Sequence, residues 1–321
     1  MNSSTFNARV FRKLTAAVDI CTFELISADG TPLPAFSAGS HIDVLAPGGI
    51  TRQYSLCNDP AESHRYLIAV LKDSATRGGS KAMHEAVNEG DVIQISAPKN
   101  HFQLAHDARR SLLIAGGIGV TPILCMAERL AIAGGDFEMH YSARSRDRMA
   151  FQERIRRSAF SERVVFHFDD GEPSQKLDIT ALVAEPAPGT HLYVCGPKGF
   201  MDSVLATARA RGWPETQLHY EFFSAEVKNS ESDGSFDIKL ASSGRVLRVD
   251  KDKTVVQALA EADIEVQTSC EQGVCGTCLT RVLDGVPDHR DMYLTPEEQR
   301  ANDQFLPCCS RAKSPMLVLD L

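Results

Sequence analysis

The stretch SCEQGVCGTC at residues 269–278 contains three cysteines, Cys270, Cys275 and Cys278, in a C-x4-C-x2-C spacing. A fourth cysteine follows downstream in the segment LPCCS at residues 306–310. Three thiolates from one short loop and a fourth from a distant segment are the ligand pattern of plant-type [2Fe–2S] clusters. The spacing therefore predicts an iron–sulfur centre, which carries one electron at a time.

The cysteine loop has the glycines that such a centre needs. Gly273 and Gly276 allow the backbone to curl where a Cβ atom would crowd the cluster. A zinc knuckle, or buried cysteines that only pack, is the alternative. Structural zinc usually takes two C-x2–4-C pairs, and the second pair is missing. Cys308 and Cys309 compete for the fourth ligand position; because adjacent side chains point in different directions, one should bind the cluster and the other should pack.

Composition limits the class of protein. A chain of 321 residues suits two or three domains. Its net charge of −8 argues against nucleic acid or an anionic membrane as a partner and suits docking on a basic patch. We expect no signal peptide and no membrane span, because the N-terminus lacks an apolar segment and no run is long enough. Cysteines outside the cluster are expected to be thiols in a reducing cytoplasm; they are Cys21, Cys57, Cys125, Cys195 and whichever of the adjacent pair is not a ligand.

The pattern of apolar residues predicts three domains. Residues 1–105 contain short alternating strands, which favour an antiparallel β-barrel. Residues 106–226 alternate apolar runs with helical patterns, which predicts an α/β domain with a parallel sheet. A polar stretch at 226–234 is interpreted as a linker before a domain at 235–321. The expected strands are 22–26, 41–44, 65–71, 92–95, 112–115, 138–141, 164–166, 192–195, 236–240, 246–249 and 316–319, and the expected helices are 81–87, 122–131 and 255–262.

Two motifs in the first region suggest a flat, phosphorylated cofactor. In RQYSLCN at 52–58, the ring of Tyr54 could lie on an aromatic cofactor while Arg52 binds its phosphate. The segment RGGS at 77–80 precedes a predicted helix, and backbone N–H groups there can bind a phosphate. A simple loop with a helix cap is the alternative for the second motif.

Two glycine-rich turns in the second region suggest a dinucleotide site. AGGIGVTP at 115–122 lies between a predicted strand and a predicted helix, where a parallel sheet usually binds such ligands. It is not a G-x-G-x-x-G motif, so alone it is weak. CGPKGFM at 195–201 follows a later strand. After the second strand, Ser142, Arg144, Arg146 and Arg148 could meet an adenosine ribose or its 2′-phosphate, although a solvated basic loop is as good an interpretation.

These four motifs, in this order, resemble those of the phthalate dioxygenase reductase family, and within it the reductase components of vanillate O-demethylase type. The resemblance covers essentially the whole chain. It implies a flavin-binding β-barrel, an NAD-binding α/β domain and a C-terminal α+β ferredoxin-like β-grasp domain. It also implies FMN, NADH and a [2Fe–2S] cluster as cofactors.

The resemblance assigns a role to each motif. It implies Cys308 as the fourth ligand and Cys309 as a packing residue. It implies Ser55, Thr121 and Cys195 as catalytic residues, with Ser55 and Thr121 beside the flavin and Cys195 close to the nicotinamide. The implied metal ligands are Cys270, Cys275, Cys278 and Cys308; the FMN contacts are Arg52, Gln53, Tyr54, Ser55, Ala69, Val70, Leu71, Arg77, Gly78, Gly79, Ser80, Thr121 and Phe223; and the NADH contacts are Gly116, Gly117, Gly119, Pro122, Ser142, Arg144, Cys195, Gly196 and Pro197.

The implied function is an NADH-dependent reductase that passes electrons through FMN and the cluster to a separate Rieske-type oxygenase. That oxygenase would hydroxylate or demethylate an aromatic acid. The basic loop at 144–148 admits NADPH, but NADH is favoured from the resemblance. A reductase that feeds a ferredoxin or a cytochrome is one alternative, and a non-catalytic ferredoxin-like module is another.

Overall fold

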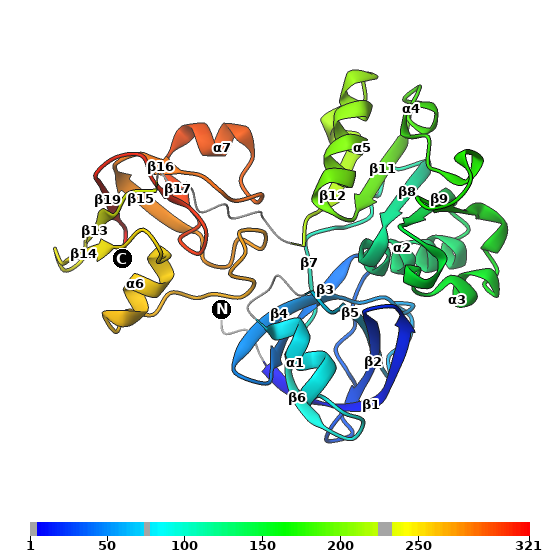
Figure 1. Cartoon of the computed structure of the whole chain (residues 1–321), viewed down its shortest axis with the longest axis horizontal. Helices are drawn as coiled ribbons and strands as arrows, with labels where there is room; N and C mark the ends of the chain where they lie inside the picture. The colour runs from blue at the N-terminus through cyan, green and yellow to red at the C-terminus, as the bar shows by residue number, and fades with distance from the viewer. Residues whose placement is uncertain (1–4, 74–77, 224–232) are drawn as a thin grey trace. The chain divides into compact units, whose positions relative to one another are not determined.

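The structure is a computed structural model that describes residues 5–73, 78–223 and 233–321. The chain divides into two compact units, Met1–Glu221 and Phe222–Leu321 (Figure 1). The first unit holds an antiparallel and a parallel sheet, and the second holds two smaller sheets. The chain is therefore multidomain, as the sequence predicts.

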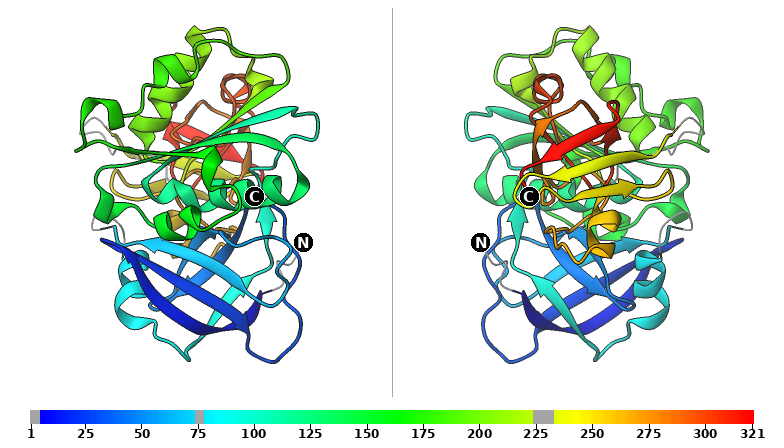
Figure 2. Two further views of the ribbon diagram at one scale, coloured as in Figure 1. Left: turned by 90° about the vertical axis from the view of Figure 1, so that its right-hand side faces the viewer. Right: turned by 90° about the vertical axis from the view of Figure 1, so that its left-hand side faces the viewer.

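The antiparallel sheet is formed by the first third of the chain. Its strand order is β4-β3-β6-β1-β2-β5, with β7 paired to β3, and its strands are drawn in blue and cyan in Figure 2. Alternate side chains, such as Phe23 and Leu25 or Ile42 and Val44, form its buried core. An isolated bridge joins Leu56, after β4, to Ile68 in β5. The elements are β1 (Thr5–Ala17), β2 (Ile20–Ser27), β3 (Ser40–Ala46), β4 (Ile50–Ser55), β5 (Tyr66–Leu71), α1 (Gly79–Ala86), β6 (Val92–Ser96) and β7 (Lys99–Asn100).

The parallel sheet has the order β10-β9-β8-β11-β12. Its order reverses between β8 and β11, so the carboxyl ends of these two strands form the switch point where open parallel sheets bind ligands. Both strands are almost wholly buried, as continuous apolar runs predict. The elements are β8 (Arg110–Gly116), η1 (Gly117–Gly119), α2 (Val120–Ala133), β9 (Asp136–Ala143), η2 (Arg146–Arg148), α3 (Gln152–Arg156), η3 (Ser161–Arg163), β10 (Val164–Phe168), η4 (Pro173–Gln175), α4 (Ile179–Leu182), β11 (Thr190–Cys195), α5 (Lys198–Ala210), η5 (Glu215–Gln217) and β12 (Leu218–Glu221).

The second unit contains a mixed sheet of order β14-β13-β19-β15-β17 and a two-stranded ribbon of β16 and β18. Helix α6 begins with a capping box, in which Thr254 Oγ1 accepts from Gln257 N–H and the Gln257 side chain accepts from Thr254 N–H. Ile238, Leu259 and Leu317 meet in the core beneath it. The elements are β13 (Phe236–Leu240), β14 (Val246–Val249), α6 (Val255–Glu261), β15 (Thr280–Asp284), β16 (Pro287–Asp288), α7 (Pro296–Ala301), β17 (Gln304–Phe305), β18 (Arg311–Ala312) and β19 (Met316–Leu319).

All the strands and helices expected from the sequence are present, with ends that differ by a few residues. Several elements were not expected from the sequence: β1, β4, β7, β12, β15, β16, β17, β18, α3, α4, α5 and α7. The expected linker at 226–234 falls largely outside the described residues. In the described part of the chain, no helix has both the length and the apolar character needed to cross a membrane.

Candidate functional site

Arg52 and the start of helix α1 form one candidate phosphate site. Gly78, at the N-cap, has a φ of 100°, which favours glycine. A Cβ on Gly79 would lie 2.9 Å from Arg52 Cγ, so the buried arginine lies directly against the first turn of the helix. The helix N-terminus offers backbone N–H groups, and Arg52 adds a positive charge. Arg77, which the sequence places in the same site, lies outside the described residues.

Tyr54 has a buried hydroxyl group to which a ligand could bind. Its hydroxyl has no hydrogen-bond partner among the described residues. Burial raises the pKa of Tyr54 well above its usual value, so the hydroxyl stays protonated. A buried hydroxyl without a partner is costly, and the polar edge of a bound flavin would satisfy it. Its neighbour Gln53 instead donates to Asp43 Oδ1 at 3.0 Å.

Strand β5 divides its three predicted flavin contacts between two faces. Val70 lies in the core of the antiparallel sheet, and its carbonyl contacts His84 Nε2 at 2.8 Å. Ala69 and Leu71 lie on the opposite face, because side chains alternate along a strand. Ala69 is buried and Leu71 is partly exposed. A ligand on this face could touch the side chains of Ala69 and Leu71 but not that of Val70.

The predicted catalytic residues Ser55 and Cys195 converge on Glu221, which the sequence reasoning did not select. Ser55 Oγ donates to Glu221 Oε2 at 3.3 Å, and Cys195 Sγ donates to the Glu221 carbonyl at 3.3 Å. His41 Nδ1 lies 4.0 Å from Glu221 Oε1. Burial raises the pKa of Glu221 to about 7, although the hydrogen bond from Ser55 opposes this rise. A carboxyl group with such a pKa can hold or release a proton near neutral pH.

The two glycine-rich turns lie side by side at the switch point. A Cβ on Gly119 would collide with the Cys195 backbone and lie 2.5 Å from Gly196 N. A Cβ on Gly196 would lie 3.0 Å from Gly116 Cα. Pro197 lines the same junction, since it contacts Gly116. Gly117 has a φ of 53°, and Pro122 lies in the first turn of α2. The glycines thus let the two turns pack against each other, and a Cβ on Gly117 would meet no atom within 4 Å, so a nucleotide can approach the backbone there.

Residues after β9 lie beside the same junction. Ser142 pairs with Gly116 across the sheet, and its hydroxyl is buried without a hydrogen-bond partner among the described residues. Arg144 follows and is exposed. The other two arginines have contacts of their own, because Arg148 Nη1 lies 3.1 Å from Asp19 Oδ2 and Arg146 lies over the ring of Phe168.

The four predicted cluster ligands are buried and form two pairs. Cys270 donates to Cys275 and lowers the pKa of the Cys275 thiol, and Cys308 raises the pKa of Cys278 in the second pair. No group of three or more metal-binding side chains is found within residues 5–73, 78–223 and 233–321. Two pairs of thiols fit two irons with two thiolates each, rather than one zinc ion with four.

Cys309 packs against the cluster loop, as expected for the cysteine predicted not to bind the cluster. Gly273 has a φ of 72°, and a Cβ there would lie 2.5 Å from Cys309 Sγ. Cys309 is thus buried against the outside of the loop, where it makes a weak hydrogen bond of 3.7 Å to the Leu306 carbonyl. Gly276 has a φ of 71° and lies against the ring of Tyr293.

Two predicted contacts need separate mention. Thr121 is buried in the first turn of α2, where its hydroxyl donates to the Ile118 carbonyl at 3.1 Å. Phe223 is half-buried and follows the boundary between the two units. Its place beside a flavin stays a prediction.

Comparisons with known proteins agree with this site. Residues 238–313 match the family model described as a 2Fe-2S iron-sulfur cluster binding domain, and residues 93–218 match the N-terminal domain model of dimethylamine monooxygenase subunit DmmA-like proteins. The chain is 56% identical to a vanillate O-demethylase oxidoreductase of Pseudomonas putida, over 98% of this chain and 99% of that protein.

Two solved structures can be aligned with nearly the whole chain. A phthalate dioxygenase reductase, described as a modular structure for electron transfer from pyridine nucleotides to [2Fe–2S], is 38% identical with a TM-score of 0.81 and covers 99% of this chain and 98% of its own. An intact type IV self-sufficient cytochrome P450 monooxygenase is 41% identical with a TM-score of 0.81, over 99% of this chain and 41% of its own.

Proposed function

Because the chain belongs to the phthalate dioxygenase reductase family, we propose that it takes electrons from NADH on a bound FMN and delivers them, through a [2Fe–2S] cluster, to a separate Rieske-type oxygenase that acts on an aromatic acid. The chain is an oxidoreductase of this family, so the interpretation as a non-catalytic module is set aside. One observation carries the proposal: Ser55, from the antiparallel half, and Cys195, from the parallel half, meet at Glu221.

FMN is supported by the polar groups around β4. Arg52 and the amides at the start of α1 would hold a terminal phosphate, and the Tyr54 hydroxyl would bind the ring or its side chain. When bound, the flavin accepts two electrons with a hydride and passes them on singly. The Ser55 hydroxyl donates a hydrogen bond to the Glu221 carboxyl at this site, and Glu221 can take up or release a proton of its own near neutral pH.

NADH would enter from the glycine-rich turns. Gly117, where an added Cβ would meet no atom within 4 Å, leaves room for NADH beside the turn, and Ser142 supplies a hydrogen bond. Cys195 is fully buried, and burial raises the pKa of its thiol well above the usual value. It therefore stays a neutral thiol that packs and excludes water rather than attacking as a thiolate. NADH is favoured over NADPH because Arg146 and Arg148 already have partners.

The proposed domains follow the sequence prediction. We assign FMN to residues 1–105, NADH to 106–226 and the cluster to 235–321. The Leu56–Ile68 bridge links the two edges of the antiparallel sheet and supports its closure into a barrel. The cytoplasm stays the proposed compartment for the thiols outside the cluster.

The test is anaerobic mixing of the purified holoprotein with NADH in a stopped-flow spectrometer. We expect the flavin absorbance to bleach, followed by a slower loss of cluster absorbance. Flavin that stays oxidised would refute the proposal. Extraction of the flavin, followed by mass determination, separates FMN from FAD.

A second candidate function differs only in the partner. The similarity to a self-sufficient cytochrome P450 favours a haem protein as the electron acceptor. Adding reduced holoprotein to a purified Rieske oxygenase of the vanillate type, and separately to a bacterial P450, distinguishes the two. Faster reduction of the Rieske centre supports the first candidate.

A further inference from the structure

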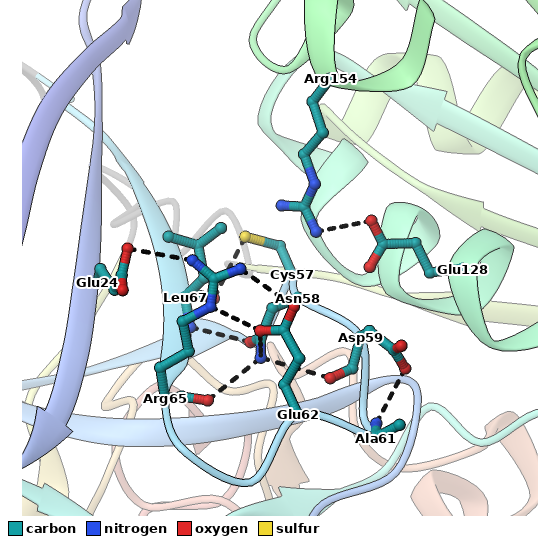
Figure 3. Close-up of polar contacts among 10 residues, drawn as sticks. All are labelled: Glu24, Cys57, Asn58, Asp59, Ala61, Glu62, Arg65, Leu67, Glu128 and Arg154. Carbon is teal, nitrogen blue, oxygen red and sulfur yellow. Dashed lines mark hydrogen bonds and ion pairs between the residues drawn. The ribbon is translucent and has the colours of Figure 1, made fainter. Parts of the chain in front are cut away.

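A largely buried ion pair of the parallel-sheet half faces the antiparallel half of the first unit. Arg154 Nη2 donates to Glu128 Oε1 at 2.6 Å, and both side chains are largely buried. Arg154 Nη1 and Glu128 Oε2 are buried and have no hydrogen-bond partner among the described residues. The Arg154 guanidinium also lies near the thiol of Cys57, as Figure 3 shows, and its charge opposes the effect of burial, which raises the pKa of Cys57 to about 12.

Cys57 begins a rigid segment between the two strands that carry the proposed flavin contacts. Its N–H and its thiol both donate to the Leu67 carbonyl, at 2.9 and 3.2 Å. Asn58, which is fully buried, accepts from Leu67 N–H at 2.9 Å. Arg65 donates to Glu62 at 2.6 Å and to Glu24 at 3.1 Å (Figure 3). Because β4 ends at Ser55, two residues before Cys57, and β5 begins at Tyr66, a shift of this segment would move both strands.

Helix α2 faces the same segment along one side. Thr121, Cys125 and Glu128 follow the i, i+4, i+7 spacing that places residues on one helix face, over a rise of about 10 Å. The Cys125 thiol accepts a hydrogen bond from the backbone of Gly39 in the antiparallel half and lies close to Cys57. Helix α2, which begins at the glycine-rich turn of the proposed NADH site, therefore packs against the antiparallel half from Thr121 to Glu128.

The segment from Asp147 to Arg154 adds further contacts between the halves. Val18 N–H donates to the Asp147 carbonyl at 2.9 Å, and Arg148 pairs with Asp19 at 3.1 Å. Phe151 has a φ of 61°, which is strained for an aromatic residue, and Arg154 lies over its ring.

This segment also packs against both proposed cofactor sites. Ala150 and Phe151 form an apolar cluster with Ala69 of β5 and Ile118 of the glycine-rich turn. Ala69 is a proposed flavin contact, and Ile118 lies between two proposed NADH contacts. One short segment therefore touches the strand of one site and the turn of the other.

We propose that Arg154, held by Glu128, is a positioning residue that sets the approach of the nicotinamide to the flavin; this inference rests on the proposed function. In the step concerned, the C4–H bond of NADH breaks, the hydrogen leaves with both electrons to the flavin, and NAD⁺ remains. Arg154 neither gains nor loses a proton. Its role is geometric, since a misplacement of about 1 Å can lower such a rate by about a hundredfold.

The energetics favour a positional role over a stabilising one. Burying two charges costs desolvation, and a well-packed apolar pair of similar volume is often as stable. The pair here is also incompletely hydrogen-bonded, which adds to its cost. The Arg154–Glu128 pair therefore stabilises the fold little. Its place beside both proposed cofactor sites is best explained if it orients the segments that carry them.

The experiment compares Arg154→Met and Arg154→Lys with a matched control, Arg157→Met. Arg157 caps the same helix, and its substitution removes an exposed ion pair with Glu153. We expect Arg154→Met to slow the limiting rate of flavin reduction by NADH at least tenfold. Its FMN content and the NADH concentration at half-maximal rate should stay within threefold of wild type. Arg154→Lys should recover part of the rate, and Arg157→Met should match wild type.

A second measurement does not depend on turnover. Hydrogen exchange of the oxidised holoprotein should be faster at the amides of Cys57 and Leu67 in Arg154→Met but not in Arg157→Met. A wild-type limiting rate in Arg154→Met overturns the inference, and so does a rate loss that only follows loss of FMN and is not recovered by lysine. If Arg154→Met does not fold, Glu128→Gln replaces it with the same criteria. Wild-type protein that NADH does not bleach refutes the proposed function instead.

Discussion

At the scale of single residues, Glu221 has a carboxyl group whose pKa differs strongly from its value in water. Its carboxyl accepts a hydrogen bond from Ser55 and lies 4.0 Å from His41, and burial raises its pKa to about 7. The folded protein therefore keeps a proton on Glu221 that the unfolded chain loses near pH 4.5. Stability from this group must fall as the pH rises from about 4.5 to 7 and then level off.

Glu221→Gln tests this assignment in two ways. Compared with wild type, the variant should gain about 1–3 kcal/mol of unfolding free energy between pH 5 and 8, because the glutamine has no charge to bury. The limiting rate of flavin reduction should lose the inflection near pH 7 that we expect in wild type. Thermal unfolding and stopped-flow rates across this pH range provide both readouts. An inflection that survives in the variant would assign it to another group.

Cys308 and Cys309 differ in what their sulfurs touch, so their serine variants should differ. Cys308 faces Cys278, whereas Cys309 packs against Gly273 outside the pairs of ligands. We expect Cys308→Ser to lose at least about nine-tenths of the cluster absorbance, since an alcohol is a poor iron ligand. Cys309→Ser should keep the cluster and lose only about 1 kcal/mol of stability. Iron and sulfide analysis checks both; equal loss in the two variants would contradict the assignment.

A functional residue could be identified from the sequence only where its partners lie within a few positions of it along the chain. The cysteine loop and the glycine-rich turns place their groups within a few positions of each other, so spacing alone points to the chemistry. Glu221 lies 166 positions from its partner Ser55, and Arg154 is one of several arginines in a basic stretch. Only the fold brings such residues together, so neither could be selected beforehand.

At the scale of strands and helices, two histidine pairs link neighbouring strands of the parallel sheet. His140 of β9 contacts His167 of β10 at 2.9 Å, and His191 of β11 contacts His219 of β12 at 2.8 Å. Each pair is stacked. Each contact needs one N–H donor and one bare nitrogen, so the accepting ring of each pair must be neutral.

Protonation of these pairs should weaken the sheet. Burial, and next the neighbouring histidine, lower the pKa values of His167 and His219. Their contribution to stability is therefore present above about pH 6.5 and lost as the pH falls below it. We expect His167→Gln and His219→Gln each to reduce the drop in unfolding free energy between pH 7.5 and 5.5 by about 1 kcal/mol. Exposed His64→Gln is the control, and thermal unfolding is the measurement. An unchanged drop would exclude the pairs as its cause.

The elements that the sequence reasoning missed share a physical reason. Strand β1 exposes most of its side chains, so no apolar face marks it, although it pairs with both β2 and β6. Helix α5 starts directly after the CGP turn, and its buried positions, such as Met201 and Leu205, are separated by polar residues. Buried strands such as β8 and β11 are continuous apolar runs and were easy to place.

At the scale of the whole molecule, charge and division into units matter most. The net charge of −8 suits a weak, brief encounter with a basic surface on the electron acceptor. Such an encounter is screened by salt, since the Debye length falls from about 10 Å at 0.1 M to about 3 Å at 1 M. Transfer inside one chain has no such encounter, so salt should slow delivery to the partner but not flavin reduction.

The division into units predicts that one substitution can abolish the cluster without affecting the reduction of the flavin. Each unit has its own apolar core, around Phe23 and Ile42 in the first and around Ile238 and Leu317 in the second. Cys275→Ser should therefore abolish the cluster absorbance while NADH still bleaches the flavin at a rate within about twofold of wild type. Reduction of a Rieske oxygenase should fall at least about tenfold, because the flavin would have lost its route to the partner.

The matched control is Cys21→Ser, which changes a thiol that lies in the first unit and outside the cluster. It should leave the cluster, flavin reduction and partner reduction intact. Visible spectra, anaerobic stopped-flow traces and partner reduction measure the three quantities on the same samples. If Cys275→Ser also stopped flavin reduction with its FMN still bound, the first unit would depend on the cluster-bearing unit for its chemistry, and the modular account would fail.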